Sequence, residues 1–154
     1  MDRRQERELE TARKTAMAAL SLAPVDELKR LCAAAGISGE AEMLRGPETG
    51  LVSVRGRIGG GGAPFNFGEA TVTRATVRLP SGEIGHSYAL GRDKDKARLS
   101  AITDALWQNA DRRADIEEKV IAPLRAAQAE ADATSRAETA ATKVDFFTMV
   151  RGED

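Results

Sequence analysis

Apolar residues recur every three or four positions at the start of the chain, which predicts an amphipathic helix over residues 3–22. Its apolar positions are Leu9, Ala12, Ala16 and Leu20. Pro24 suits the first position of a second helix, because a helix start tolerates the missing amide and fixed φ of proline. Gly36 is placed to end that helix. The expected buried face of the second helix consists of Val25, Leu28, Leu31, Cys32 and Ala35.

From about residue 40 to residue 91, apolar and polar residues alternate, which predicts β-strands. The alternation is clear around Val52, again over residues 70–79, and again over residues 84–90. Pro80-Ser-Gly-Glu83 supplies turn chemistry before the last of these segments. We therefore expect an antiparallel meander of three or four strands. The apolar side of the last strand is expected to carry Ile84, His86, Tyr88 and Leu90.

Helical spacing returns at about residue 95, with Asp93 as the expected N-cap. Pro123 is expected to kink or restart the helical segment. Residues 125–142 are Ala-rich with scattered charge, and form either a solvated helix or an arm that is ordered only against a partner. The order of elements predicts an α+β fold: N-terminal helices, an antiparallel sheet, C-terminal helices and an extended C-terminal arm. The apolar stripe of the later helices comprises Leu99, Ile102, Leu106, Trp107, Ile116, Val120 and Ile121.

The last twelve residues, from Lys143 to Asp154, are unusually apolar for a chain end and hold two of the four phenylalanines. Chain ends are normally polar and frayed. This tail either folds back onto its own domain or inserts into a partner, and we favour the partner because an exposed apolar segment marks an interaction site. The expected partner interface consists of Val144, Asp145, Phe146, Phe147, Met149, Val150 and Arg151.

The 154 residues suit one domain. The net charge of −1 argues against a general polyanion binder. Charge is nevertheless unevenly spread: residues 45–98 hold nine basic and five acidic side chains, a net charge of +4. Most of these basic residues are arginines, whose planar guanidinium suits a small anion.

Cys32 is the only cysteine, so an intrachain disulfide and a cysteine-based zinc site are both excluded. We interpret it as a small core residue and not as a nucleophile. The charged start has no apolar signal segment, and no apolar run is long enough for a membrane span. We therefore expect a cytoplasmic protein that binds no membrane and no metal.

Three features have both a structural and a functional interpretation. The Gly59-Gly-Gly-Gly62 run lacks the ending of a P-loop and favours a hairpin loop, although glycine-rich turns beside Arg55 and Arg57 can also cradle anions. His86 is either a structural histidine on an apolar face or a contact at a shared site. The Gly91-Arg-Asp-Lys-Asp-Lys96 cluster is either a solvated helix start capped by Asp93 or an anion site.

A complete active site is not recognisable in the sequence. Glu48 and Glu69 have no fixed separation that would make them a carboxylate pair, and no Ser/His/Asp or Cys/His pattern is present. The residues by themselves therefore indicate a binding or assembly module.

Several strings together resemble one family. They are Arg45-Gly-Pro-Glu-Thr-Gly-Leu-Val52, Arg57-Ile-Gly-Gly-Gly-Gly62, Pro64-Phe-Asn-Phe-Gly-Glu69, Thr71-Val-Thr-Arg74, Gly85-His86-Ser87, Gly91-Arg-Asp-Lys94, Asp104-Ala-Leu106 and Val144-Asp-Phe-Phe-Thr-Met-Val-Arg-Gly152. In this order they closely resemble the PhnG family, the small subunits of the bacterial phosphonate carbon–phosphorus lyase core complex. The match runs from about residue 15 to the end, which leaves residues 1–14 as a variable N-terminal extension of a domain spanning 1–154, with residues 143–154 as its interaction arm.

The resemblance implies a role in phosphonate catabolism within a complex of subunits H, I and J and an ATP-binding-cassette-like subunit. This complex transfers a phosphonate onto C1 of the ribose of ATP and displaces adenine, which yields a ribose 1-phosphonate 5-triphosphate. ATP is then a substrate of the complex, and the iron–sulfur cluster and S-adenosylmethionine belong to subunit J. The family assigns no catalytic residue to this subunit and no cofactor to it alone.

We expect residues near the anionic substrate to come from the central basic region. The candidates are Arg57, Gly59, Gly60, Glu69, Thr73, Arg74, His86, Arg92, Asp93 and Lys94. Two other function classes stay open: a stand-alone phosphonate or nucleotide sensor, and a single-stranded nucleic-acid binder. The second is disfavoured, because only 4% of the residues are aromatic and base stacking needs aromatic side chains on the sheet.

Overall fold

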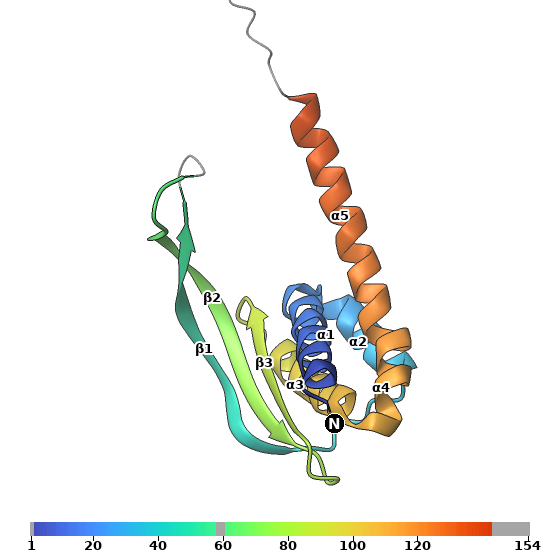
Figure 1. The fold of residues 1–154 in the computed structure, drawn as a ribbon. Coiled ribbons are helices and arrows are strands. Elements are labelled where there is room, and N and C mark those ends of the chain that lie inside the picture. The colour runs from blue at the N-terminus through green and yellow to red at the C-terminus, as the bar shows by residue number, and fades with distance from the viewer. Residues whose placement is uncertain (1, 58–60, 143–154) are drawn as a thin grey trace, which may run out of the picture.

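The computed structural model describes residues 2–57 and 61–142, and confirms an α+β fold (Figure 1). The elements are α1 (Arg3–Leu22), α2 (Val25–Ala34), β1 (Glu42–Gly56), β2 (Phe65–Arg78), β3 (Ile84–Leu90), α3 (Lys94–Gln108), α4 (Ala110–Ile116), a π-helical turn η1 (Glu117–Ile121) and α5 (Ala122–Ala141). Helix α1 includes most of residues 1–14, and Leu9 packs against the core from this segment.

The three strands form one antiparallel sheet in the order β1-β2-β3. Strands β1 and β2 are 15 and 14 residues long, whereas β3 has only seven residues. Residues 51–56 and 65–71 therefore extend past the last β2–β3 pair, Val72 with Leu90, and we call these residues the distal hairpin. Gly82 closes the β2–β3 turn with a φ of 104°, a value that favours glycine.

The helices that the structure describes lie on one face of the sheet (Figure 1). We call this the covered face and the opposite one the open face. The covered face carries Thr73, Ala75 and Val77 of β2, all of them buried. On β3 it carries Gly85, Ser87 and Ala89, which are also buried. Alternation therefore places the intervening side chains of both strands on the open face.

This arrangement corrects our interpretation of β3. Ile84, His86, Tyr88 and Leu90 do share one side of the strand, but that side is the open face and all four are exposed. The reason is the close approach of α3: a Cβ on Gly85 would lie 1.9 Å from the carbonyl oxygen of Ala101. Only small residues fit between β3 and α3, so the large ones point outward. His86 is consequently not a packed core histidine.

Two clusters of buried side chains hold the layers together. One lies between α3 and the sheet and is built mainly from alanines, together with Val77, Leu79 and Ile102. The other joins α1, α2, α3 and the α4–η1 segment around Trp107. Cys32 is a free, buried member of the second cluster, as expected, and burial raises the pKa of its thiol. Its unreactive, protonated form is thereby favoured.

The break expected at Pro123 takes the form of the π-helical turn η1, which directly precedes α5. A π turn widens the helix, and proline, which has no amide to donate, then stands near the start of α5. From Arg125 onward the helix is mostly exposed, and it projects away from the body (Figure 1). Of the two interpretations of residues 125–142, the structure shows the solvated helix. None of the described helices has the length and hydropathy that crossing a membrane would require.

Candidate functional site

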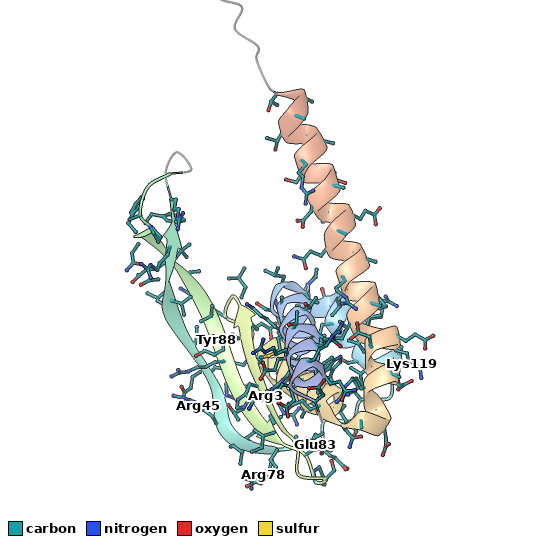
Figure 2. All side chains as sticks on the ribbon, viewed as in Figure 1. Arg3, Arg45, Arg78, Glu83, Tyr88 and Lys119 are labelled. Carbon is teal, nitrogen blue, oxygen red and sulfur yellow. The ribbon has the colours of Figure 1, made fainter. Side chains whose placement is uncertain are left out.

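Charged residues of β1 and β2 meet on the open face of the sheet, next to Tyr88 of β3. Figure 2 labels Arg45 and Tyr88 on the outer two strands. The carboxylate of Glu48 accepts hydrogen bonds from Arg45 Nε at 3.1 Å and from Arg74 Nη2 at 3.0 Å. Cross-strand pairing sets this contact, because Glu48 of β1 lies opposite Arg74, which in turn lies opposite Tyr88 of β3. We call Arg45, Glu48 and Arg74 the arginine trio. It carries a net charge of +1.

The pKa values in the trio follow from these contacts. The neighbouring Tyr88 and then Glu48 raise the pKa of the Arg74 guanidinium. The two arginines, Arg74 foremost, lower the pKa of Glu48. Both groups therefore stay charged across the physiological range. Because they are exposed, the pairs orient the side chains without adding much stability.

His86 lies on the same face, where its Nδ1 is 3.2 Å from the hydroxyl of Thr76. Its backbone amide turns the other way and donates to the carboxylate of Asp104 at 2.8 Å. Strand β3 is an edge strand, so this side-chain contact satisfies an amide that has no neighbouring strand. His86 is thus held in place by α3 while its ring faces outward.

Asp104 is a buried anionic centre that our sequence reasoning did not select. Its side chain is 1% exposed and forms a two-pronged ion pair with Arg13 of α1, at 2.9 and 2.8 Å. The contact raises the pKa of Arg13 through the hydrogen bonds to Asp104. The available signal was an acidic residue inside the apolar stripe between Ile102 and Leu106. Asp104 joins α1, α3 and β3 and shows no access to a substrate.

The turn from β3 to α3 gathers four of the predicted residues. The hydroxyl of Thr73 donates to the carbonyl oxygen of Gly91 at 2.8 Å, and it lies 3.0 Å from the hydroxyl of Thr49. Thr73 is buried, so its role in this structure is to fix the turn. Arg92 and Lys94 are exposed on either side of Asp93.

Asp93 is the N-cap of α3, as predicted, and accepts the amide of Lys96 at 2.7 Å. Lys96 is a buried lysine that sequence reasoning missed. Its Nζ lies 3.4 Å from the carbonyl oxygen of Leu90, and burial lowers the pKa of its ammonium despite the nearby Asp93. The turn therefore combines one buried and two exposed cationic side chains.

Two further candidates lie on or next to the distal hairpin. Arg57 is exposed just past the end of β1, and Glu69 is exposed opposite Ser53. Gly59 and Gly60 lie outside the described residues. So do the tail residues Val144, Asp145, Phe146, Phe147, Met149, Val150 and Arg151.

The structure thus distributes the described candidates over three places: the distal hairpin, the open face and the β3–α3 turn. The last two are neighbours, because the amide of Gly91 donates to the carbonyl oxygen of Thr71 at 2.9 Å, next to Val72 of the open face. Across residues 2–57 and 61–142, no three acidic, histidine or cysteine side chains gather as metal ligands. A charged sheet face next to a cationic turn is typical of a module that binds an anion or another protein.

Comparison with known proteins identifies the family of this chain. The family model described as phosphonate metabolism protein PhnG matches residues 11–152. A protein of Rhizobium meliloti (strain 1021), the alpha-D-ribose 1-methylphosphonate 5-triphosphate synthase subunit PhnG, is 56% identical over 145 residues, which cover 92% of this chain and 90% of the relative. The chain therefore belongs to the PhnG family of phosphonate metabolism proteins.

Proposed function

We propose that this chain is a subunit of a synthase that forms a ribose 1-phosphonate 5-triphosphate from ATP and a phosphonate during organic phosphonate catabolism. The observation that carries this proposal is the 56% identity to a relative named as such a subunit, over nearly the full length of both chains. The complex displaces adenine from C1 of the ribose and joins the phosphonate there. The chain is required in the complex and has no turnover alone.

Its partners are subunits H, I and J and an ATP-binding-cassette-like subunit of the carbon–phosphorus lyase system. The support is the word "subunit" in the name of the relative, together with the motif resemblance. ATP is a substrate of the complex, whereas the iron–sulfur cluster and S-adenosylmethionine belong to subunit J. The chain acts as one domain over 1–154, with the variable extension 1–14 at one end and the arm 143–154 at the other.

The contribution of this chain is to position an anion and to hold a partner. The exposed side chains of Arg57, Arg92 and Lys94 and the partly exposed Arg74 support a surface for the triphosphate or for an acidic partner segment. The other candidates for this surface are Gly59, Gly60, Glu69, His86 and Asp93, and the buried Thr73 supports it by fixing the β3–α3 turn. The partner interface is the arm, with Val144, Asp145, Phe146, Phe147, Met149, Val150 and Arg151.

The test is to assay ATP and methylphosphonate with three preparations: the chain alone, the co-expressed complex, and the complex without the chain. Adenine release and a new phosphonate ester signal in ³¹P spectra report turnover. We expect turnover only in the complete complex. Turnover by the isolated chain, or full activity without it, contradicts the proposal. Tight binding of ATP or phosphonate by a chain that never joins the complex supports a stand-alone binding module.

A further inference from the structure

A hollow of about 180 Å³ lies on the open face of the sheet. It is lined by residues 48–52 of β1, by Val72 and Arg74 of β2 and by Tyr88 of β3. Gly50 stands opposite Val72, which stands opposite Leu90, so a residue without a side chain occupies the outer position of this row. The missing side chain leaves the space that its neighbours border.

Nothing in the described part of this chain requires glycine at position 50. An added Cβ would meet no atom within 4 Å, and the φ of Gly50 is not positive. Gly85 shows the opposite case, because a Cβ there would strike the backbone of α3. The space above Gly50 is therefore open surface volume that another molecule can fill.

The hollow has apolar walls and a cationic rim. Val52 and Tyr88 border it on the open face and are 37% and 53% exposed, and the partly buried Val72 of the central strand lies between them. The arginine trio stands beside it, with two guanidinium groups sharing the single carboxylate of Glu48. An apolar side chain followed or preceded by a carboxylate would complement both parts, since each arginine keeps donors for a second acceptor.

We propose that this hollow is the anchor pocket for a partner subunit of the synthase, which inserts an apolar side chain over Gly50 and places an adjacent carboxylate on Arg74 and Arg45. The inference rests on the proposed function, which supplies the partner. A second copy of this chain fits less well, because a face-to-face pair would bring two arginine trios of the same charge together. The described helices of the chain itself lie on the covered face (Figure 1).

The sharpest test fills the hollow without disturbing the fold. Gly50→Leu is compared with Gly46→Leu, a position on the same strand where an added Cβ also meets no atom within 4 Å and which does not line the hollow. Each tagged variant is co-expressed with untagged wild-type chain and the partner subunits. Mass spectrometry of the purified complex gives the ratio of variant to wild type. Thermal melts of each free variant serve as the folding control.

We expect Gly50→Leu to lower its share in the complex by at least about tenfold, since anchor pockets dominate interface energy, and Gly46→Leu to leave the share unchanged. Arg74→Glu should lower the share as well, because it repels the partner carboxylate. Equal incorporation of Gly50→Leu and wild type overturns the pocket while leaving the proposed function intact. If wild-type chain does not enter the complex, both fail. If Gly50→Leu instead disrupts a dimer of the isolated chain, the occupant is a second copy and our assignment is wrong.

Discussion

The two faces of strand β3 are built in opposite ways. On the covered face the strand presents Gly85, Ser87 and Ala89, which are small and buried against α3. On the open face it presents its largest side chains, which remain exposed. The usual association of large apolar residues with the core therefore fails here. Close packing against α3 limits the size of the side chains on the covered face. The open face has no such limit, so its side chains can be selected for binding.

This difference separates the residues that stabilise the fold from the residues that we expect to act in assembly or activity. Changes on the covered face should destabilise the fold. A larger side chain there would push α3 away from β3 and disrupt the buried cluster that the two elements share. Changes on the open face and on the projecting segments should leave the fold intact and affect assembly or activity. The four predictions below test this separation, beginning with the largest effect.

Gly85→Ala should have the largest effect on stability. The added Cβ would lie 1.9 Å from the carbonyl oxygen of Ala101 and 2.6 Å from the amide nitrogen of Ala105, both of them backbone atoms of α3. Overpacking against a backbone costs more than against a flexible side chain, so we expect a loss of about 3 kcal/mol or more. Urea unfolding measures it. Gly68→Ala is the control, since its Cβ would meet nothing within 4 Å. Equal stability of the two variants would contradict the close packing of α3 on β3.

Asp104→Ala should lower the free energy of unfolding by about 3 kcal/mol, because it breaks a buried ion pair and leaves the amide of His86 without its acceptor. Asp104→Asn should cost less, since an amide oxygen can still accept that hydrogen bond. Asp95→Ala, which removes an exposed pair with Lys29, should change the free energy of unfolding by no more than about 0.5 kcal/mol. If Asp104→Ala melts like the control, Asp104 does not tie α1 to β3.

Much of the fold could be predicted, because the helical periodicity of apolar residues is visible in the sequence. The face of α2 with Leu28, Leu31 and Cys32 is buried as expected. The orientation of β3 could not be predicted, because alternation gives the two sides of a strand but not which one a helix covers. To predict that Gly85 lies on the covered side of β3, one would have to know that α3 approaches the strand closely enough to exclude a Cβ.

The site was less predictable than the fold for a related reason. Residue type alone selected Arg74, Arg92 and Thr73, but whether a side chain is free to bind depends on contacts that only the folded chain makes. Thr73 is buried and donates its hydroxyl hydrogen bond to the carbonyl oxygen of Gly91, whereas Arg74 faces outward and keeps N–H donors for a further acceptor. Asp104 escaped selection because its partner, Arg13, is 91 residues away in the sequence.

Deleting residues 143–154 should affect assembly and leave the free energy of unfolding nearly unchanged. Burial of Phe146, Phe147 and their apolar neighbours in a partner contributes roughly 1.5–3 kcal/mol per side chain, from which the ordering of the segment subtracts several kcal/mol. We expect co-purification with the partner subunits to be strongly weakened. Phe146→Ala combined with Phe147→Ala should cause most of the same loss, because aromatic anchors dominate interfaces. If the truncated chain unfolds, the tail belongs to its own core. If it assembles normally, the tail is neither core nor interface.

Arg74→Lys and Arg92→Lys should give the smallest effects and distinguish the two neighbouring parts of the proposed surface. Both substitutions keep the charge and remove the forked donor geometry, so only a contact that uses several donors at once will be sensitive. We expect each to lower the activity of the complex by about tenfold if it holds a phosphate in this way, equivalent to about 1.4 kcal/mol. Arg74→Lys should also weaken incorporation, because Arg74 borders the hollow over Gly50, whereas Arg92→Lys should change activity and ATP affinity without changing incorporation. Arg78→Lys is the matched control, since Arg78 pairs with Glu42 at 3.5 Å on the same face and does not line the hollow. If both variants match this control in activity and incorporation, Arg74 and Arg92 are ordinary surface charges. The role of the open face would then rest on the incorporation measured for Gly50→Leu alone.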